Sequence, residues 1–230
     1  MEDKIDFIFK SVQKIESSVG AQQARIEKLE TSVEALSNEV LTLKTLVNVR
    51  EQELRTCNIR ISGFPLTPEE KSSDSKYLAE RIYDRVLRPI LTAAKANSLV
   101  EKVPTLSNTI SSCYRVGNAA AKSGKPNAPP VVVKLASSVL KIAIMKSKRD
   151  STPGPTDAEK SAGHRKVLIF EDLTPPAFKK LKELQEREEI SKAWSIDGRL
   201  FFILQGSTTI VRVSSVFNDI VTILNRAQPK

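Results

Sequence analysis

Residues 5–54 carry a heptad repeat whose spacing never slips. With Ile5 as position a, apolar residues recur at alternating intervals of three and four up to Leu54, and only Gln22 and Arg50 interrupt them. The seam positions that we predict to make contacts between chains are Ile5, Ile8, Val12, Ile15, Val19, Gln22, Ile26, Leu29, Val33, Leu36, Val40, Leu43 and Val47. Because one helix cannot bury so narrow a seam by itself, residues 1–54 are predicted to form a parallel coiled coil in an oligomer.

The number of chains in this coiled coil is less sharply indicated. The a positions before Leu54 are β-branched, whereas the d positions are Ile at the start and Leu later, so both dimers and trimers are compatible with the seam. Arg25 occupies a g position and Glu30 an e position, so their side chains can pair between neighbouring parallel helices. This short pattern resembles one associated with parallel trimers. It favours a homotrimer, with a dimer as the alternative.

Positive charge is concentrated in the middle of the chain. The formal net charge is +9, and residues 55–150 carry 17 Lys and Arg against 7 Asp and Glu. Residues 1–54 carry 7 against 10. A basic segment of this kind favours a polyanionic partner, most often nucleic acid.

Several classes of protein are disfavoured by composition. No run of apolar residues approaches the roughly 18 of a membrane span, and no signal peptide opens the sequence, so we expect a soluble intracellular protein without membrane contact. Cys57 and Cys113 are too few for a disulfide framework and are expected to be buried thiols. His164 is the only histidine and has no cluster of ligands around it, and no Gly-rich phosphate loop occurs. We therefore expect no catalytic residue, metal site or cofactor, and a binding protein rather than an enzyme.

After Leu54 the apolar pattern changes from helical spacing to alternation. Strands are predicted at 57–65, 109–116, 131–135 and 166–170, and helices at 74–96 and 137–149. Pro89 predicts a kink or an early end in the first helix. The segments 117–130 and 150–163 are predicted to be flexible loops. The order β-α-β-β-α-β over residues 55–172 is that of ferredoxin-like folds and of RNA-recognition motifs, so the expected fold class is α+β.

The last part of the chain, residues 173–230, is predicted to be a small α+β domain. Thr174 followed by Pro175 marks the start of a helix that runs to about residue 190. Asp197-Gly198 predicts the turn of a hairpin between 193–196 and 199–204. A further strand is expected at 208–213 and a short helix at 214–224.

Three segments follow the coiled coil in an informative order: 57–65 (CNIRISGFP), 131–135 with the Lys-rich helix after it, and 167–184 (VLIFEDLTPPAFKKLKEL). Together they resemble the RNA-binding protein encoded by the first open reading frame of LINE-type retrotransposons, and the resemblance covers nearly the whole chain. The segment around Trp194 is also similar to the C-terminal domain of baculovirus few-polyhedra proteins. Many members carry a longer region before the coiled coil than this sequence shows.

The resemblance implies a homotrimer in which each chain has an atypical RNA-recognition-motif-like domain and a nucleic-acid-binding C-terminal domain. The implied activity is sequence-independent binding and chaperoning of single-stranded RNA and DNA. In retrotransposition such a protein packages the element's own RNA into cytoplasmic ribonucleoprotein particles, and nuclear entry is left open.

Alternation in the strands indicates which side chains face the open side of the sheet. Ile59 and Ile61 would face the helices, and Arg60 would face outward together with Val132 and Lys134. These central strands lack the aromatic residues that stack on bases in ordinary RNA-recognition motifs, so we predict contacts to phosphates with little base readout. Trp194, Phe201 and Phe202 are expected to be core residues.

Basic residues along the chain are the candidates for RNA contact. They are Arg55, Arg60, Arg115, Lys122, Lys125, Lys134, Lys146, Lys148, Arg149, Lys179 and Lys180. Lys146, Lys179 and Lys180 match basic positions of the family. For each residue the alternative is ordinary surface charge, including favourable charge at the end of a helix.

Two other functions remain open at this point. The chain could be a structural adaptor that binds proteins, or its basic face could bind duplex DNA. The adaptor is favoured if Arg60, Lys134, Lys146 and Lys180 lie on unrelated faces.

Overall fold

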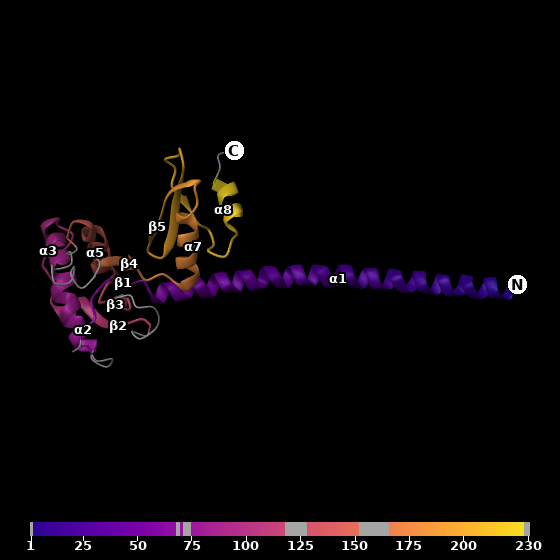
Figure 1. The fold of residues 1–230 in the computed structure, drawn as a ribbon, viewed down its shortest axis with the longest axis horizontal. Coiled ribbons are helices and arrows are strands. Elements are labelled where there is room, and N and C mark those ends of the chain that lie inside the picture. Colours follow the sequence, from indigo (N-terminus) through magenta and orange to yellow (C-terminus); the bar gives the residue numbers. More distant parts are fainter. Residues whose placement is uncertain (1, 68–69, 71–74, 118–127, 152–165, 228–230) are drawn as a thin grey trace. The chain divides into compact units, whose positions relative to one another are not determined.

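The computed structural model describes residues 2–67, 70, 75–117, 128–151 and 166–227. It has a mixed α+β fold with a long N-terminal helix and two antiparallel sheets (Figure 1). The chain divides into two compact units, Met1–Val47 and Asn48–Lys230, so the division falls inside the first helix rather than at its end. The candidate residues Lys122 and Lys125 lie outside the described residues.

Helix α1 (Glu2–Leu54) covers the whole segment predicted from the heptad repeat. In the first unit the described seam side chains from Val12 to Val47 are exposed, and Ile15 and Val33 are 62% and 61% exposed. The predicted helix is therefore confirmed. Its association with further copies stays a prediction.

The second unit contains, after the last turns of α1, a four-stranded sheet of strand order β2-β3-β1-β4. Its strands are β1 (Asn58–Ser62), β2 (Ile110–Arg115), β3 (Val131–Leu135) and β4 (Leu168–Glu171). All four lie where alternation predicts them. On the inner face Ile59 and Ile61 are fully buried, in the same core cluster as Val131 and Val133, which confirms their predicted orientation.

Helices cover the inner face of this sheet. They are α2 (Ser75–Ile82), the π-helical turn η1 (Tyr83–Leu87), α3 (Arg88–Ala96) and α5 (Ser138–Ser151), with the short α4 (Leu106–Thr109) before β2. The wide turn η1 ends just before Pro89. Because proline lacks an N–H and crowds the preceding turn, a wider turn accommodates it without ending the helix. Instead of the predicted kink or early end at Pro89, the helix has a π-helical turn before this residue and then continues as α3.

The second sheet has the strand order β5-β6-β7. Its strands are β5 (Ile190–Ile196), β6 (Arg199–Leu204) and β7 (Val211–Arg212), and its helices are α7 (Pro175–Gln185) and α8 (Ile220–Ala227). The Thr174 hydroxyl accepts a hydrogen bond from the Ala177 N–H, which confirms the predicted helix start. Helix α7 is shorter than predicted, and the predicted strand at 208–213 is reduced to two residues.

The turn between β5 and β6 is the one that the sequence indicates. Asp197 and Gly198 both have positive φ, at 50° and 74°. Two successive positive φ angles match the right-handed twist of a hairpin, and Gly adopts them without strain. The predicted hairpin is confirmed.

Candidate nucleic-acid interface

A row of side chains crosses the outer face of the first sheet. Tyr114 lies opposite Val132, Val132 opposite Arg60, and Arg60 opposite Phe170. We call these four residues the outer row. Tyr114 and Phe170 are 54% and 47% exposed, and Lys134, further along β3, is exposed as well. The basic side chains of the central strands are thus flanked by accessible rings on the two edge strands.

This arrangement corrects two details of the predicted sheet face. Val132 belongs to the outer face but is buried, because larger side chains on both neighbouring strands cover a small β-branched one. The central strands lack stacking aromatic residues as expected, yet the edge strands supply Tyr114 and Phe170. Alternation next to the buried Cys113 and Ile169 was the signal that could have placed both rings outward.

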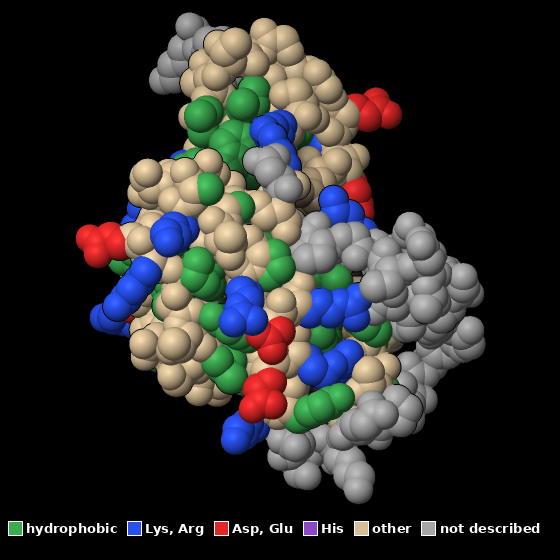
Figure 2. Space-filling view, turned by 90° about the vertical axis from the view of Figure 1, so that its left-hand side faces the viewer, with side chains coloured by type: hydrophobic (Ala, Val, Ile, Leu, Met, Phe, Trp, Pro, Cys, Tyr) green, Lys and Arg blue, Asp and Glu red, His purple; other side chains and the backbone are tan. Residues whose placement is uncertain are grey.

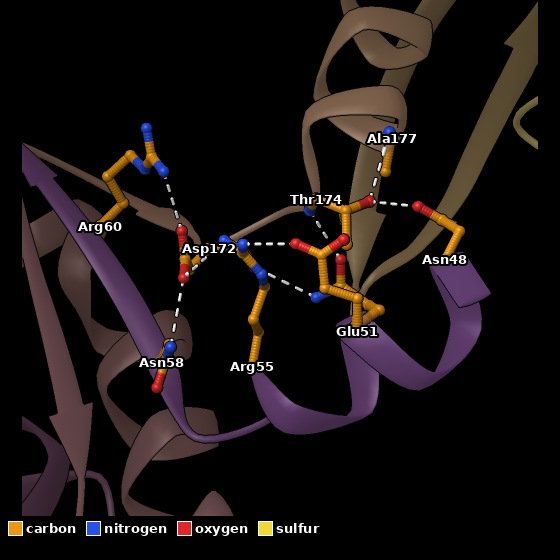
Figure 3. A network of polar contacts seen from close by, with 9 residues as sticks. Asn48, Glu51, Arg55, Asn58, Arg60, Asp172, Thr174 and Ala177 are labelled. Carbon is orange, nitrogen blue, oxygen red and sulfur yellow. Dashed lines mark hydrogen bonds and ion pairs between the residues drawn. The ribbon is translucent and has the colours of Figure 1, made fainter. Parts of the chain in front are cut away.

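One buried carboxylate holds two of the predicted RNA-binding arginines (Figure 3). Asp172 accepts hydrogen bonds from Arg60 at 3.0 Å, from Arg55 at 3.2 Å and from Asn58 at 3.2 Å. The Asp172 side chain is only 2% exposed, whereas the two arginines keep 33% and 26% exposure. Arg55 also pairs with Glu51 at 2.6 Å. Charged hydrogen bonds of this kind fix the guanidinium groups while leaving part of each in solvent.

The last turns of α1 are bonded to the segment that joins the two sheets. Gln52 donates through Nε2 to the Asp172 carbonyl at 3.1 Å and accepts through Oε1 from the Thr174 N–H at 2.9 Å. The Thr174 hydroxyl donates to Asn48 Oδ1 at 2.6 Å. Gly198, in the hairpin turn, lies so close to Gln52 that a Cβ there would overlap its side chain. Gln52 is therefore a meeting point of α1, the Asp172–Thr174 segment and the second sheet.

Lys148 reaches the edge of β4 from helix α5. Its Nζ donates to the Ile169 carbonyl at 2.6 Å and lies 5.9 Å from the centroid of the Phe170 ring. Burial lowers the pKa of Lys148, and the charge of Glu171 opposes that change. This places a cation next to one end of the outer row.

A second buried carboxylate, Glu171, connects the first sheet with the hairpin. It accepts from the backbone N–H groups of Asp197 at 2.7 Å and Gly198 at 3.3 Å, and it pairs with the buried Lys141 at 3.0 Å. Burial alone would raise the pKa of Glu171, but hydrogen bonds from Ser195 and Lys141 outweigh burial and lower it. Sequence reasoning did not single out Lys141, because nothing local indicates that a lysine is buried in a pair.

Arg115 is placed differently from the expectation. Its guanidinium donates to both carboxylate oxygens of Glu70, at 2.7 and 2.9 Å. Its other N–H groups donate to the carbonyls of Phe64, Pro65 and Pro129. With a side chain only 12% exposed, Arg115 ties loops to the end of β2. This geometry favours a structural role over contact with RNA.

The remaining candidates do not join the outer row. Lys146 and Arg149 are exposed on α5, which packs on the inner side of the sheet. On α7, Lys180 is 11% exposed and pairs with Glu183 at 2.7 Å, whereas Lys179 is 81% exposed. Figure 2 shows Lys and Arg at separate places over one face, with hydrophobic and acidic side chains between them. The structure thus brings together Arg55, Arg60 and Lys134, with Lys148 at the edge.

Among the described residues, no group of three or more His, Cys, Asp or Glu could hold a metal ion. No helix in the described part of the chain has the length and apolar character needed to cross a membrane. No protein-family model matches the chain, and no curated protein matches it in sequence.

Proposed function

We propose that this protein binds single-stranded nucleic acid, above all RNA, without sequence preference. The observation that carries the proposal is the outer row, in which Arg60 lies between Tyr114 and Phe170, with Lys134 beside it. Aromatic rings stack on any unpaired base, and cations replace the counterions of the phosphates. The exposed rings extend the earlier expectation of phosphate contacts alone to include base stacking.

The proposal includes assembly through α1 into a parallel coiled coil, as a homotrimer. The exposed seam and the pair Arg25 and Glu30 support it. Tethering several weak sites raises apparent affinity by roughly 10²–10⁴-fold when they can engage one strand together. Individual contacts then exchange while the assembly stays bound, which is what a nucleic-acid chaperone requires.

The proposal also extends to the LINE-type resemblance. The strand order β2-β3-β1-β4 with helices on one face supports a fold like that of RNA-recognition motifs. With the sequence resemblance, it favours a protein that packages a retrotransposon's RNA into cytoplasmic ribonucleoprotein particles.

One observation favours the alternative of a protein-binding adaptor. Lys146 and Lys180 lie on α5 and α7, away from Arg60 and Lys134. These four cations therefore do not share one face, which is the arrangement expected of an adaptor. Arg60 is also already paired with a carboxylate. Nucleic-acid binding predicts that substitutions in the outer row weaken RNA binding, whereas the adaptor function predicts that they do not.

A salt titration of RNA binding by the full chain separates these functions. We expect log K to fall linearly with log salt, with a slope of about −0.7 per phosphate contact. Lys134→Gln should make the slope shallower, and Phe170→Leu should weaken binding about tenfold. Lys146→Gln is the matched control and should change neither. A flat salt dependence, or equal affinity in all variants, favours the adaptor, and equal competition by duplex DNA of the same length contradicts single-strand preference.

A further inference from the structure

The second sheet has an aromatic outer face of its own. Trp194 on β5 lies opposite Phe201 on β6, and Phe201 lies opposite Arg212 on β7. The two rings stack with centroids 6.1 Å apart and planes inclined by 21°. Both are partly exposed, whereas the adjacent Phe202 is fully buried in the core. The expectation of core residues is therefore right for Phe202, while Trp194 and Phe201 lie on the opposite face.

Cations accompany this ring pair. Lys192 Nζ lies 5.6 Å from the centroid of the Trp194 ring, Arg212 follows Phe201 in the row, and Arg199 lies at the start of β6. All three side chains are exposed. The described outward residues of β5, β6 and β7 are Lys192, Trp194, Ile196, Arg199, Phe201, Ile203 and Arg212, and none of them is acidic. We call this set the tryptophan face.

Acidic groups near the hairpin are engaged elsewhere. The Asp197 carboxylate lies 3.4 Å from Lys141 Nζ, and Glu171 accepts from the backbone of the turn. Among the described residues, no acidic side chain on β5, β6 or β7 forms an ion pair with Lys192, Arg199 or Arg212. The positive charge of the tryptophan face is therefore not balanced on its own strands. Burial in a core explains neither the exposed rings nor the cations beside them.

We propose that the tryptophan face is a second site for single-stranded nucleic acid. Unpaired bases stack on Trp194 and Phe201, and the adjoining phosphates pair with Lys192, Arg199 and Arg212. An acidic protein surface would use the cations but not the ring faces, whereas a single strand uses both. Lys192 is a flexible, exposed side chain, so it turns from the ring to a phosphate when a base takes its place. The inference rests on the proposed function and adds to it a site that the first sheet does not contain.

The chain offers a direct reporter, because Trp194 is its only tryptophan. The full-length protein is titrated with an oligouridylate while Trp emission is recorded. In parallel, the anisotropy of a labelled copy of the same oligonucleotide reports binding. Inorganic polyphosphate serves as the anion without bases. We expect oligouridylate to quench Trp194, and polyphosphate to bind without comparable quenching.

Variants locate the effect. Phe201→Leu should weaken oligouridylate binding about fivefold or more, and Arg212→Gln should make its salt dependence shallower. Trp194→Phe keeps a ring and should bind nearly as well as the parent chain. Phe170→Leu is the matched control on the first sheet: it weakens total binding but leaves quenching of Trp194 intact at saturation.

The outcomes separate the inference from the proposed function. Binding by anisotropy with unchanged Trp194 emission overturns the tryptophan face and leaves the proposed function standing. Equal quenching by polyphosphate overturns base stacking at this face. Absence of oligouridylate binding in the anisotropy assay overturns the proposed function and the inference with it. Because the parent chain provides the emission signal, the test does not depend on the folding of any variant.

Discussion

Arg60 Nη2 lies 3.0 Å from Asp172 Oδ1, and this ion pair joins the outer row to the segment that leads into the second sheet. The carboxylate is buried, while the guanidinium still meets solvent. Asp172 therefore fixes the positions of both guanidinium groups. Under the proposed function it would orient Arg60 and Arg55 for an anionic ligand and also compete with that ligand for them.

Replacing Asp172 by Asn tests this double role. The amide has the same shape but lacks the charge, and losing charged hydrogen bonds should lower the free energy of unfolding by about 2 kcal/mol. The released arginines should bind RNA more tightly and steepen the salt dependence by about one phosphate contact. Urea unfolding and an anisotropy salt titration measure the two effects. Weaker RNA binding by a folded variant would show that orientation matters more than competition.

Two glycines provide a matched test of the contact between the hairpin and α1. Gly198 and Gly206 have nearly equal φ angles of +74° and +73°, but only Gly198 lies against Gln52. Gly206→Ala should cost about 1 kcal/mol from backbone strain alone. Gly198→Ala should lower the free energy of unfolding clearly more, because the added Cβ displaces the Gln52 side chain and breaks its hydrogen bonds to the backbone of Asp172 and Thr174.

A double variant completes this comparison. In the Gln52→Ala background the extra effect of Gly198→Ala should disappear, leaving the two glycine substitutions equal in thermal or urea unfolding. Equal effects in the parent chain would contradict a close contact.

The exposed apolar seam of α1 leads us to expect an oligomer, whose mass can be measured. We expect sedimentation equilibrium of the full chain to give a trimer, and Leu29→Lys to shift it to monomer because a charge at a d position opposes burial. Thr31→Lys, at an outward position of the same heptad, is the control and should leave the mass unchanged. A dimeric parent chain would contradict the proposed homotrimer. A monomeric parent chain would contradict the coiled coil itself.

The two thiols should differ in reactivity. Burial, with a further contribution from Glu70, raises the pKa of Cys113 to about 11, and its Sγ donates to the Ser75 carbonyl. Cys57 is only partly buried. Because the thiolate is the reactive form, iodoacetamide near pH 8 should modify Cys57 first and Cys113 only after urea unfolding. Peptide mass spectrometry distinguishes the sites, and equal rates in the folded protein would contradict the burial of Cys113.

The lowered pKa of Glu171 predicts a loss of stability in acid. A carboxyl whose pKa in the folded state is below its ordinary 4.5 stabilises the protein above that value, and the contribution is lost as the pH falls through the folded pKa. The parent chain should exceed Glu171→Gln in free energy of unfolding near neutral pH. This difference should shrink below pH 4.5. A difference that is constant down to strongly acidic pH would mean that the Glu171 charge contributes nothing.

Local patterns predicted the strands of both sheets because alternation, turns and helix caps act over a few neighbouring residues. The Asp197-Gly198 turn and the Thr174 cap are examples. The same patterns could not reveal that Arg115 is held by Glu70, because the two residues lie 45 positions apart. Lys141 was missed for the same reason, since its partners come from β4 and the hairpin.

The candidate site was predicted in part. Arg60 and Lys134 were placed outward by alternation, and the structure agrees. Phe170 could have been placed outward by its alternation with the buried Ile169. Trp194 was expected in the core, because an aromatic residue in a strand is more often buried. The pairing of β5 with β6 places it opposite Phe201 on the outer face instead. The burial of Lys180 against Glu183 likewise depends on packing that periodicity does not express.

Three residues, Asp172, Leu173 and Thr174, separate β4 from α7, and all three are buried. A protease finds no accessible bond there, and an inserted residue would break the hydrogen bonds to Gln52 and Arg60 together. Changes in α1 before Asn48 or in exposed loops should therefore disturb the fold less than separation of the two sheets would. The two sheets belong to one compact unit that starts at Asn48. Truncated proteins should therefore begin at or before Asn48 and should not be cut between the sheets.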